Sequence, residues 1–316
     1  MLFGIYPGGA TGDDAGGLAT GAPDSPERIS ALLDELQGTG GPFVVRAYTA
    51  FKDNAFKDTG ETPTTPADAA RYAVRGRRLD LVAQYQSATG DVAGYCDFVR
   101  ALVERHGAVT AMLQVTEEPN VTDNPVLDGH YPGVRDAITA GVVAAKSRAR
   151  ELGHDLAVGF NTTPLFGPAA SFLTDLTAGA PAFADALDYV GLDFFPDVFR
   201  PVAGDLAEGV AGLLSHHREL LRAAGLGHVP LHVTEHGWPT GPDRSPRRQA
   251  EVVQAVVRVV AENADRLGIT GYTHFALRDA DSANPGLFHN FGLTTDDYTP
   301  KPAFGAYRAL IAELGG

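Results

Sequence analysis

Eight short apolar segments, spread evenly along the chain, limit the fold that this sequence can adopt. They begin at residues 2, 43, 79, 109, 156, 189, 230 and 269. Each is continuously apolar and rich in β-branched and aromatic residues, as expected for parallel strands covered on both faces. The intervals leave room for one helix between successive strands. The pattern predicts an α/β protein, a single (β/α)8 TIM barrel over residues 1–316. A doubly wound open sheet is the alternative, but such sheets usually stop at about six strands.

Apolar residues at helical spacing lie between these segments. Ser25 and Pro26 mark a helix start, and Ile29, Leu33 and Leu36 follow on one face. Similar patterns occupy residues 96–103, 134–142, 213–221, 252–260 and 303–314. Strands and helices therefore alternate along the chain, as a barrel requires.

The charge balance excludes several classes of partner. The chain has 25 Lys and Arg against 39 Asp and Glu, a formal net charge of −14. Nucleic acids and anionic membrane surfaces both need basic patches, so neither is expected as a partner. No apolar run is long enough to cross a membrane, and the first cation is Arg28, so we see no signal peptide and expect a cytoplasmic protein. The single cysteine, Cys96, excludes an internal disulfide and a cysteine-based zinc cluster.

In a barrel, the residues that carry chemistry lie where the strands end. Two glutamates end apolar strands in this chain: Glu118 after the fourth segment and Glu235 after the seventh. A carboxylate buried in such a place must be paired or have a function, because an unpaired buried charge is costly. Arg46, at the second strand, is the obvious partner. For Glu117, strand alternation gives even odds, because one of two adjacent residues should face away from the barrel axis.

Two carboxylates on opposite walls of a barrel mouth suit the cleavage of glycosidic bonds. One carboxylic acid protonates the departing oxygen, and one carboxylate meets the positive charge that develops on the anomeric carbon. A separation of about 5–5.5 Å leads to retention through a covalent intermediate, and about 6.5–9.5 Å leads to inversion.

Short motifs at these positions resemble the clan A glycoside hydrolases. Residues 117–120 read E-E-P-N, similar to the N-E-P signature of that clan at strand 4, and residues 234–238 read T-E-H-G-W, similar to its strand 7 signature. The region from F-G-L at 291–293 to P-K-P-A at 300–303 is also similar. The resemblance implies a retaining hydrolase with Glu235 as nucleophile and Glu118 as general acid/base. It also implies that Arg46 steadies the nucleophile.

The sequence departs from the clan at two positions. Glu117 replaces the asparagine that touches the sugar 2-hydroxyl in the clan, and the usual tryptophan is missing after the eighth strand. Trp238 is the only tryptophan in the chain, so any further sugar-stacking surface must come from Phe or Tyr. The residues expected to bind substrate are Arg46, Glu117, Asn161, Asp193 and Trp238.

Two other functions compete with hydrolysis. The changed asparagine and the missing tryptophan also fit a catalytically impaired barrel that acts as a glycan-binding protein. Residues 232–236 match the zinc-hydrolase pattern H-x-x-E-H, with His232, Glu235 and His236 as its members. That pattern works on a helix, whereas a strand would place the histidines about 13 Å apart, with Glu235 on the opposite face from both. We therefore expect no metal and no cofactor. The expected partner is a small glycoside or oligosaccharide, and the sequence does not fix the oligomeric state.

Overall fold

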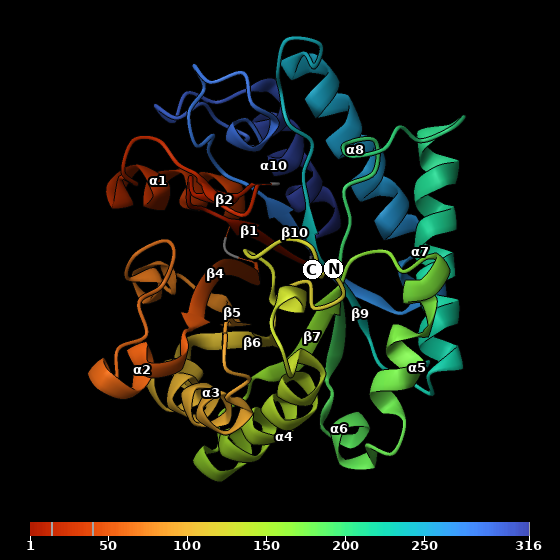
Figure 1. The fold of residues 1–316 in the computed structure, drawn as a ribbon. Coiled ribbons are helices and arrows are strands. Elements are labelled where there is room, and N and C mark those ends of the chain that lie inside the picture. The colour runs from red at the N-terminus through yellow and green to blue at the C-terminus, as the bar shows by residue number, and fades with distance from the viewer. Residues whose placement is uncertain (14, 40, 316) are drawn as a thin grey trace.

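The computed structural model describes residues 1–13, 15–39 and 41–315, and its centre is a closed barrel of eight parallel strands (Figure 1). The strands follow the order β1-β10-β9-β8-β7-β6-β5-β4 around the barrel, so each pairs with its neighbour in the chain and β1 closes the ring against β10. They are β1 (Leu2–Tyr6), β4 (Phe43–Phe51), β5 (Arg77–Tyr85), β6 (Thr110–Val115), β7 (Ala157–Thr162), β8 (Tyr189–Asp193), β9 (Leu231–His236) and β10 (Ile269–Phe275). All eight coincide with the apolar segments, which confirms the predicted barrel.

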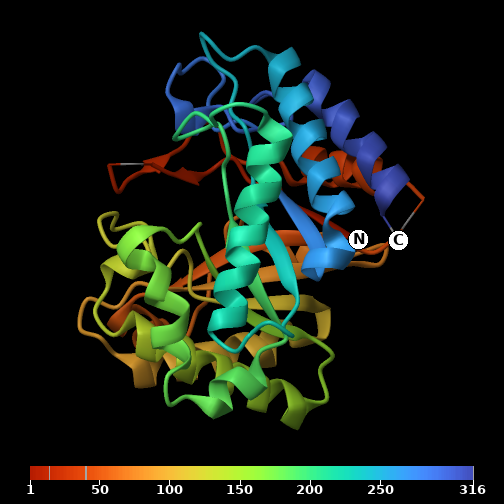
Figure 2. The ribbon, with the colours of Figure 1, turned by 90° about the vertical axis from the view of Figure 1, so that its right-hand side faces the viewer.

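A layer of helices surrounds the barrel. Figure 2 shows α7 running beside α8, with α10 next to α8 on the same side of the molecule. The helices are α1 (Pro26–Gln37), α2 (Asp53–Thr59), α3 (Val92–His106), α4 (Val134–Leu152), α5 (Phe172–Thr177), α6 (Pro181–Ala186), α7 (Leu206–Ala223), α8 (Pro246–Glu262), α9 (Ala264–Leu267) and α10 (Pro302–Leu314). Single 3-10 turns span Ala69–Tyr72, Gly107–Val109, Asp128–His130, Gly167–Ser171 and Leu287–His289.

The longer helices follow from their sequences. The helix α8 begins with Pro246 after Ser245, whose side chain accepts a hydrogen bond from the backbone N–H of Arg248. Its valines at helical spacing are buried against the barrel. Pro26 likewise opens α1 after Ser25, as predicted, but the Ser25 side chain makes no capping hydrogen bond.

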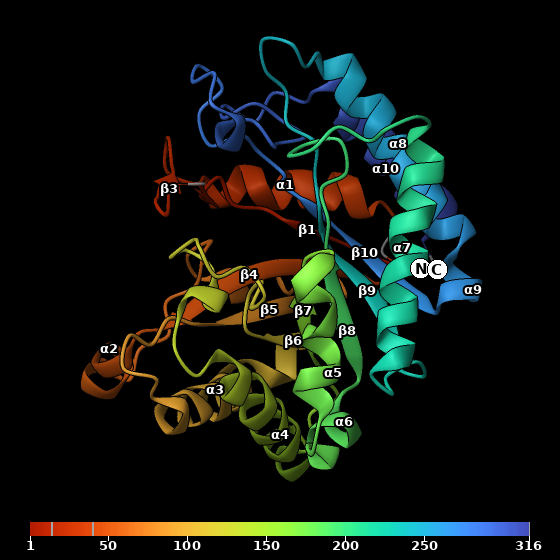
Figure 3. The same cartoon turned by 45° about the vertical axis from the view of Figure 1, so that its right-hand side comes forward.

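The helix layer is thinnest after β4 and after β7. A seven-residue helix, α2, and a 3-10 turn follow β4, while two six-residue helices, α5 and α6, follow β7. The sequence pattern had not identified helices at either place. Two short strands, β2 (Thr11–Gly12) and β3 (Leu18–Ala19), form a hairpin in the loop after β1, which projects from the barrel in Figure 3.

The strand β9 is irregular near its end. Val233 pairs with Leu192, but the next pair joins Glu235 to Asp193, so Thr234 is an extra residue on the β9 side. Such a bulge interrupts the alternation of side chains along a strand. As a result, Thr234 and Glu235, although consecutive, both contact residues inside the barrel.

The two ends of the described chain lie side by side (Figures 1 and 3), where the Met1 amino group donates to the backbone carbonyl of Leu314. Among the described residues, no helix has both the length and the apolar character needed to cross a membrane.

Candidate active site

Arg46 on β4 is the charged group around which the polar residues of the barrel mouth are arranged. Its side chain is fully buried. Nη1 donates to Oδ2 of Asp80 at 3.0 Å, and Nη2 donates to Oε1 of Gln114 at 3.0 Å and to Oε2 of Glu117 at 3.2 Å. A guanidinium presents its donors in a rigid fork, so partners on three sides hold it in one orientation. Removing its charge would leave the buried carboxylates around it uncompensated.

Glu235, at the end of β9, is held through only one of its two oxygens. Oε1 accepts hydrogen bonds from Nε of Arg46 at 3.2 Å and from the hydroxyl of Tyr48. Within the described part of the chain, Oε2 has no hydrogen-bond partner. One oxygen is thus anchored, and the other is available to a ligand.

Glu117 and Glu118 follow β6 on a backbone that leaves the extended conformation. Thr116 has a φ of 68° and Glu118 a φ of 43°, values that side-chain-bearing residues adopt at a cost of about 1–3 kcal/mol each. The two backbone N–H groups are tied down: that of Glu117 donates to Oδ2 of Asp128 at 2.7 Å, and that of Glu118 to Oδ1 of Asn161 at 2.9 Å. Strand alternation therefore stops before Glu117, and both glutamates face the same group of residues.

Asn161 on β7 and Asp193 on β8 connect to these acids through hydrogen bonds. The side-chain amide of Asn161 donates to Oδ2 of Asp193 and, at 3.4 Å, to Oε2 of Glu117. The hydroxyl of Thr234 donates to the other oxygen of Asp193. Both Asn161 and Asp193 have no exposed surface, so they support the carboxylates in this structure.

The four acids Glu117, Glu118, Asp193 and Glu235 form what we call the carboxylate cluster. One oxygen of each lies within 4.8 Å of the corresponding oxygen of every other member. Burial, reinforced by the neighbouring carboxylates, raises the pKa of Glu117 and Glu118 well above the ordinary range. The same causes raise the pKa of Asp193 to about 7. The cluster therefore holds protons at neutral pH and can act as a proton donor.

Carboxylate oxygens are also ligands for hard divalent cations, so the cluster was considered as a metal site. One oxygen of Glu117 and one of Glu235 already accept from Arg46. A permanent, buried guanidinium in the same shell repels a divalent ion. These residues therefore fit a metal poorly.

The histidines of the zinc-hydrolase pattern do not come together. His232 contacts Thr273 inside the barrel at 3.3 Å, whereas Nδ1 of His236 lies 2.5 Å from the hydroxyl of Tyr272. In the described chain, the group able to hold a metal is the carboxylate cluster, which contains neither histidine. The expectation that Glu235 faces away from both histidines is wrong for His232, because the bulge turns Glu235 inward.

The tryptophan expected to contact substrate is buried. Trp238 is 4% exposed, its indole N–H donates to the backbone carbonyl of Asp197 at 3.3 Å, and the Arg244 guanidinium lies over its ring. It has no hydrogen bond to the carboxylate cluster. Where the clan has its tryptophan, Phe275 ends β10 instead, and it stacks on Tyr6 with 5.2 Å between ring centroids.

Several residues that support the site were not predicted. They are Tyr48, Asp80 and Gln114, which hydrogen-bond to Glu235 or Arg46. A signal for the last two exists in the sequence, because each is a polar residue inside an otherwise apolar strand, in L-D-L-V at 79–82 and M-L-Q-V at 112–115. Asp128, which holds the turn after β6, gives no such signal because it lies in a loop.

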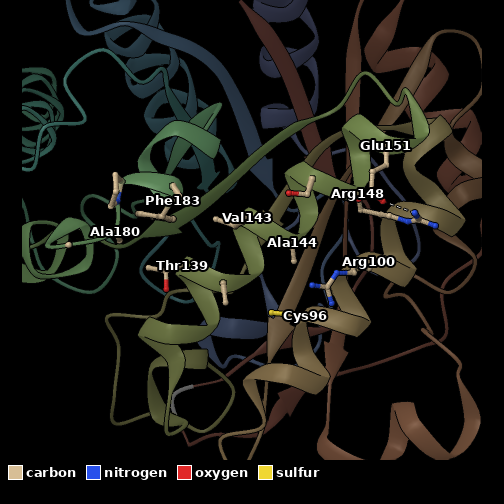
Figure 4. A pocket seen from close by; sticks show the side chains of 14 residues that line it. Cys96, Arg100, Thr139, Val143, Ala144, Arg148, Glu151, Ala180 and Phe183 are labelled. Carbon is tan, nitrogen blue, oxygen red and sulfur yellow. Dashed lines mark hydrogen bonds and ion pairs between the residues drawn. The ribbon is translucent and has the colours of Figure 1, made fainter.

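A groove of about 550 Å³ lies elsewhere, between α3, α4 and α6 on the outside of the barrel (Figure 4). The residues that line it include Cys96, Val143, Phe183, Arg100 and Arg148. Burial raises the pKa of the Cys96 thiol, which disfavours the reactive thiolate form. The groove contains no member of the carboxylate cluster.

The buried acids predict an unusual dependence of stability on pH. Burial, opposed by two backbone N–H donors, raises the pKa of Asp128 to about 8, and that of Asp193 is about 7. In the unfolded chain both have a pKa near ~3.9, so the folded state binds more protons up to about pH 8. The stabilisation that the folded state gains by keeping these two carboxyl groups protonated is therefore lost as pH rises through 7 and 8. We expect the free energy of unfolding to fall between pH 6.5 and 8.5, by about 2–3 kcal/mol from Asp128 and Asp193 alone. Glu117 and Glu118, whose pKa is also raised, add to the fall.

This pH window leaves out most of an opposing effect, which comes from the buried histidines. Burial lowers the pKa of His217, His232 and His236 to about 3, so below about pH 6.5 the unfolded chain binds more protons at these residues. Urea unfolding at pH 6.5 and 8.5 measures the change. Asp128→Asn should make the fall smaller, by about 2 kcal/mol, while the exposed Asp97→Asn should leave it unchanged. A free energy of unfolding that stays constant or rises across the window would contradict the prediction.

The comparisons with known proteins agree with this fold. No family model matches the sequence, and no curated protein is similar to it in sequence. Among solved structures, a β-glucosidase from Exiguobacterium marinum is 14% identical, with a TM-score of 0.63 over 98% of this chain and 97% of that chain. A family 39 glycoside hydrolase from Bacteroides cellulosilyticus WH2 is 14% identical, with a TM-score of 0.66 over 99% of this chain and 64% of that one. The β-glycosidase of Thermosphaera aggregans is 14% identical, with a TM-score of 0.60 over 99% and 96%. The chain therefore has the barrel fold of these glycoside hydrolases, as the resemblance to clan A implied.

Proposed function

We propose that the protein is a retaining β-glycosidase that cleaves small β-glucosides or related oligosaccharides, with Glu235 as nucleophile and Glu118 as general acid/base. The observation that carries the proposal is the approach of these two carboxyl groups, whose oxygens lie within 4.8 Å of each other. That separation belongs to the short class, in which no water fits between nucleophile and sugar. The β-glucoside class rests on the names of the similar structures.

In the first step, the free oxygen of Glu235 attacks the anomeric carbon as the glycosidic C–O bond breaks. Glu118 gives its proton to the departing oxygen, so the aglycone leaves as a neutral alcohol and the sugar remains as an ester of Glu235. Burial and the carboxylates around it raise the pKa of Glu118, which supplies that proton at neutral pH. Arg46 and Tyr48 hold the other oxygen of Glu235 and so fix the direction of attack.

In the second step, water attacks the anomeric carbon and gives a proton to Glu118, while the ester bond to Glu235 breaks. The nearby Glu235 charge is one of the causes that raise the pKa of Glu118. Forming the ester removes that charge, so the pKa of Glu118 falls just when it must act as a base. The same pair of residues can thus serve both halves of the reaction.

The remaining site residues have supporting roles in this proposal. Arg46 and Asn161 position the carboxylates, Asp193 supports Asn161, and Glu117 lies beside the reacting pair. Trp238 is buried just after the end of β9, and we give it a supporting role. In this proposal the reaction needs no cofactor or metal, and the net charge of −14 disfavours nucleic acid as a partner.

The stereochemistry of the first product tests the proposal. Proton NMR during hydrolysis of 4-nitrophenyl β-D-glucopyranoside should show the β-anomer of glucose before mutarotation sets in. Early appearance of the α-anomer would indicate inversion and would exclude the double displacement. Methyl β-D-glucopyranoside, with a poor leaving group, should give the same anomer more slowly.

A glycan-binding protein without activity is the second candidate. The observation that favours it is Glu117 in the place of the clan's asparagine. If a panel of aryl glycosides gives equal, background rates with the unaltered protein and Glu235→Gln, the enzyme proposal fails, and this alternative takes its place.

A further inference from the structure

A row of packed aromatic side chains begins at the proposed nucleophile. Tyr48, whose hydroxyl donates to Glu235, meets the ring of Tyr6 edge-on with 5.1 Å between ring centroids. Tyr6 in turn stacks on Phe275, which ends β10, at 5.2 Å. Centroid distances of this length belong to rings in direct contact. The row therefore starts at the buried carboxylates, where the reacting sugar would be held.

The row continues from Phe275 to the protein surface through the loops that follow β8 and β10. Phe275 meets Phe195 with 6.3 Å between centroids, Phe195 meets Phe199 at 5.8 Å, and Phe288 packs beside Phe199 at 6.0 Å. Phe195, Phe275 and Phe288 are partly buried, whereas Phe199 is 58% exposed. A single exposed apolar side chain is common, but an exposed ring that ends a row reaching the reacting residues is a candidate ligand surface.

The loop that carries Phe199 is held in place by residues that follow β9. The indole N–H of Trp238 donates to the backbone carbonyl of Asp197 at 3.3 Å, and Nη2 of Arg244 donates to that of Val198 at 3.0 Å. The Arg244 guanidinium lies over the Trp238 ring, 5.6 Å from its centroid. Because the backbone before Phe199 is fixed, a ligand that stacks on this ring has little ordering of the loop to oppose it.

The chemistry of the rings determines what this surface can bind. Phe195, Phe199 and Phe288 offer dispersion and π contacts but no hydrogen bond. A sugar laid on them would turn hydroxyl groups towards apolar rings, and a hydroxyl group that loses water without gaining a partner is costly to bury. A flat apolar group has no such cost. The surface therefore favours an aromatic ligand group over a second sugar.

The depth of the two ends of the row decides which part of a glycoside lies on this surface. The sugar that reacts must bring its anomeric carbon to Glu118 and Glu235, and its hydroxyl groups find polar partners in the buried carboxylate cluster. The aglycone leaves for solvent once the glycosidic bond breaks, so it extends from that buried place towards the surface. Phe199, at the exposed end of the row, is therefore placed to contact the aglycone.

We propose that Phe195, Phe199 and Phe288 form the aglycone-binding surface and that the preferred substrates are β-glycosides of phenols and arylalkyl alcohols; this inference rests on the proposed function. Phe199 supplies the exposed face for stacking, while Phe195 and Phe288 pack beside it and fix its orientation. Trp238 then acts as a positioning residue for the loop that carries Phe199.

The test compares benzyl β-D-glucopyranoside with methyl β-D-glucopyranoside and with cellobiose. Benzyl alcohol and methanol are leaving groups of similar acidity, so the ratio of their kcat/KM values reports binding of the ring. We expect this ratio to be roughly 10 to 100, the range for burying a phenyl group, and cellobiose to be hydrolysed less efficiently than the benzyl glucoside.

Variants of exposed phenylalanines make the result specific. Phe199→Ala should lower the benzyl-to-methyl ratio at least threefold, and Phe199→Tyr, which keeps the ring, should preserve it. Phe166→Ala is the matched control: this phenylalanine is 52% exposed, stacks on His216 away from the row, and should leave the ratio unchanged when replaced. The ratio does not depend on the amount of folded protein, so a loss of stability cannot imitate the effect.

Each other outcome counts against a specific statement. If cellobiose or the methyl glucoside is hydrolysed as well as the benzyl glucoside, or if Phe199→Ala leaves the ratio unchanged, the aglycone inference is wrong and the proposed hydrolase stands. If no glycoside is hydrolysed, the proposed function fails, and titration calorimetry with benzyl and methyl 1-thio-β-D-glucopyranoside tests the surface alone. Tighter binding of the benzyl compound, lost in Phe199→Ala, would support the surface, and equal or absent binding would overturn it.

Discussion

Replacing Glu235 by alanine is expected to lower kcat/KM for every glycoside substrate by a factor on the order of 10⁴ or more, because no covalent intermediate can form. The loss should be independent of the leaving group, since the missing bond is to the anomeric carbon. The protein should still fold, because Arg46 keeps Asp80 and Glu117 as partners. Rates for a series of aryl β-glycosides with phenols of different acidity measure the effect.

Two variants make this result specific. Glu235→Gln keeps the shape of the side chain and should be as inactive as the alanine variant. Glu219→Ala removes an exposed glutamate from α7 and should retain full activity. If Glu235→Ala keeps more than about a hundredth of the activity, a range that loss of general acid help alone could explain, Glu235 is not the nucleophile.

Replacing Glu118 by alanine should give a different pattern. General acid help is worth about 10²–10⁴ in rate and matters only when the departing oxygen needs a proton. An aryl glycoside with an acidic phenol should therefore still form the ester with Glu235. Hydrolysis of that ester slows without the base, so the intermediate accumulates. We expect a burst of phenol release followed by slow turnover, measured by stopped-flow absorbance.

Azide distinguishes the two glutamates further. It is a small anion that needs no general base, so it should restore turnover in Glu118→Ala and yield a β-glycosyl azide of retained configuration. With Glu235→Ala, any azide product should have the inverted configuration, because azide then attacks the substrate directly. If both variants lose activity equally across leaving groups and neither responds to azide, the two residues have no separate catalytic roles.

The barrel could be predicted because its strands are buried on both faces. Burial makes each strand a continuous apolar run, and the regular intervals then define the alternation with helices. The helices that escaped prediction are short. α5 and α6 bury apolar residues, but six residues are too few to show a helical period. The sequence of α2, D-N-A-F-K-D-T, has no helical stripe, and none of its residues is buried.

The candidate site could be predicted only in part, for a related reason. A charge at the end of an apolar strand is conspicuous, which is how Arg46, Glu118 and Glu235 were found. The orientation of a side chain depends on backbone angles that residue types do not reveal. Glu117 faces the cluster because Thr116 and Glu118 adopt positive φ values, and simple alternation could not anticipate this. Partners such as Asp80 and Tyr48 follow from the register between β4 and β5 and the position of β9, which emerge only when the barrel closes.

The bulge in β9 makes the position of the proposed nucleophile depend on the length of the strand as well as on its composition. Because Thr234 is an extra residue in the pairing of β9 with β8, Glu235 faces the inside of the barrel and reaches Arg46. A deletion of Thr234 would keep every acid of the site in the chain, yet it would move the glutamate into the position of Thr234, about 3.3 Å further back along the strand, and would remove the hydroxyl that donates to Asp193. Insertions and deletions at this point are therefore more damaging than most substitutions around it, and the residue count from Leu231 to Glu235 is as much a part of the active site as the glutamate itself.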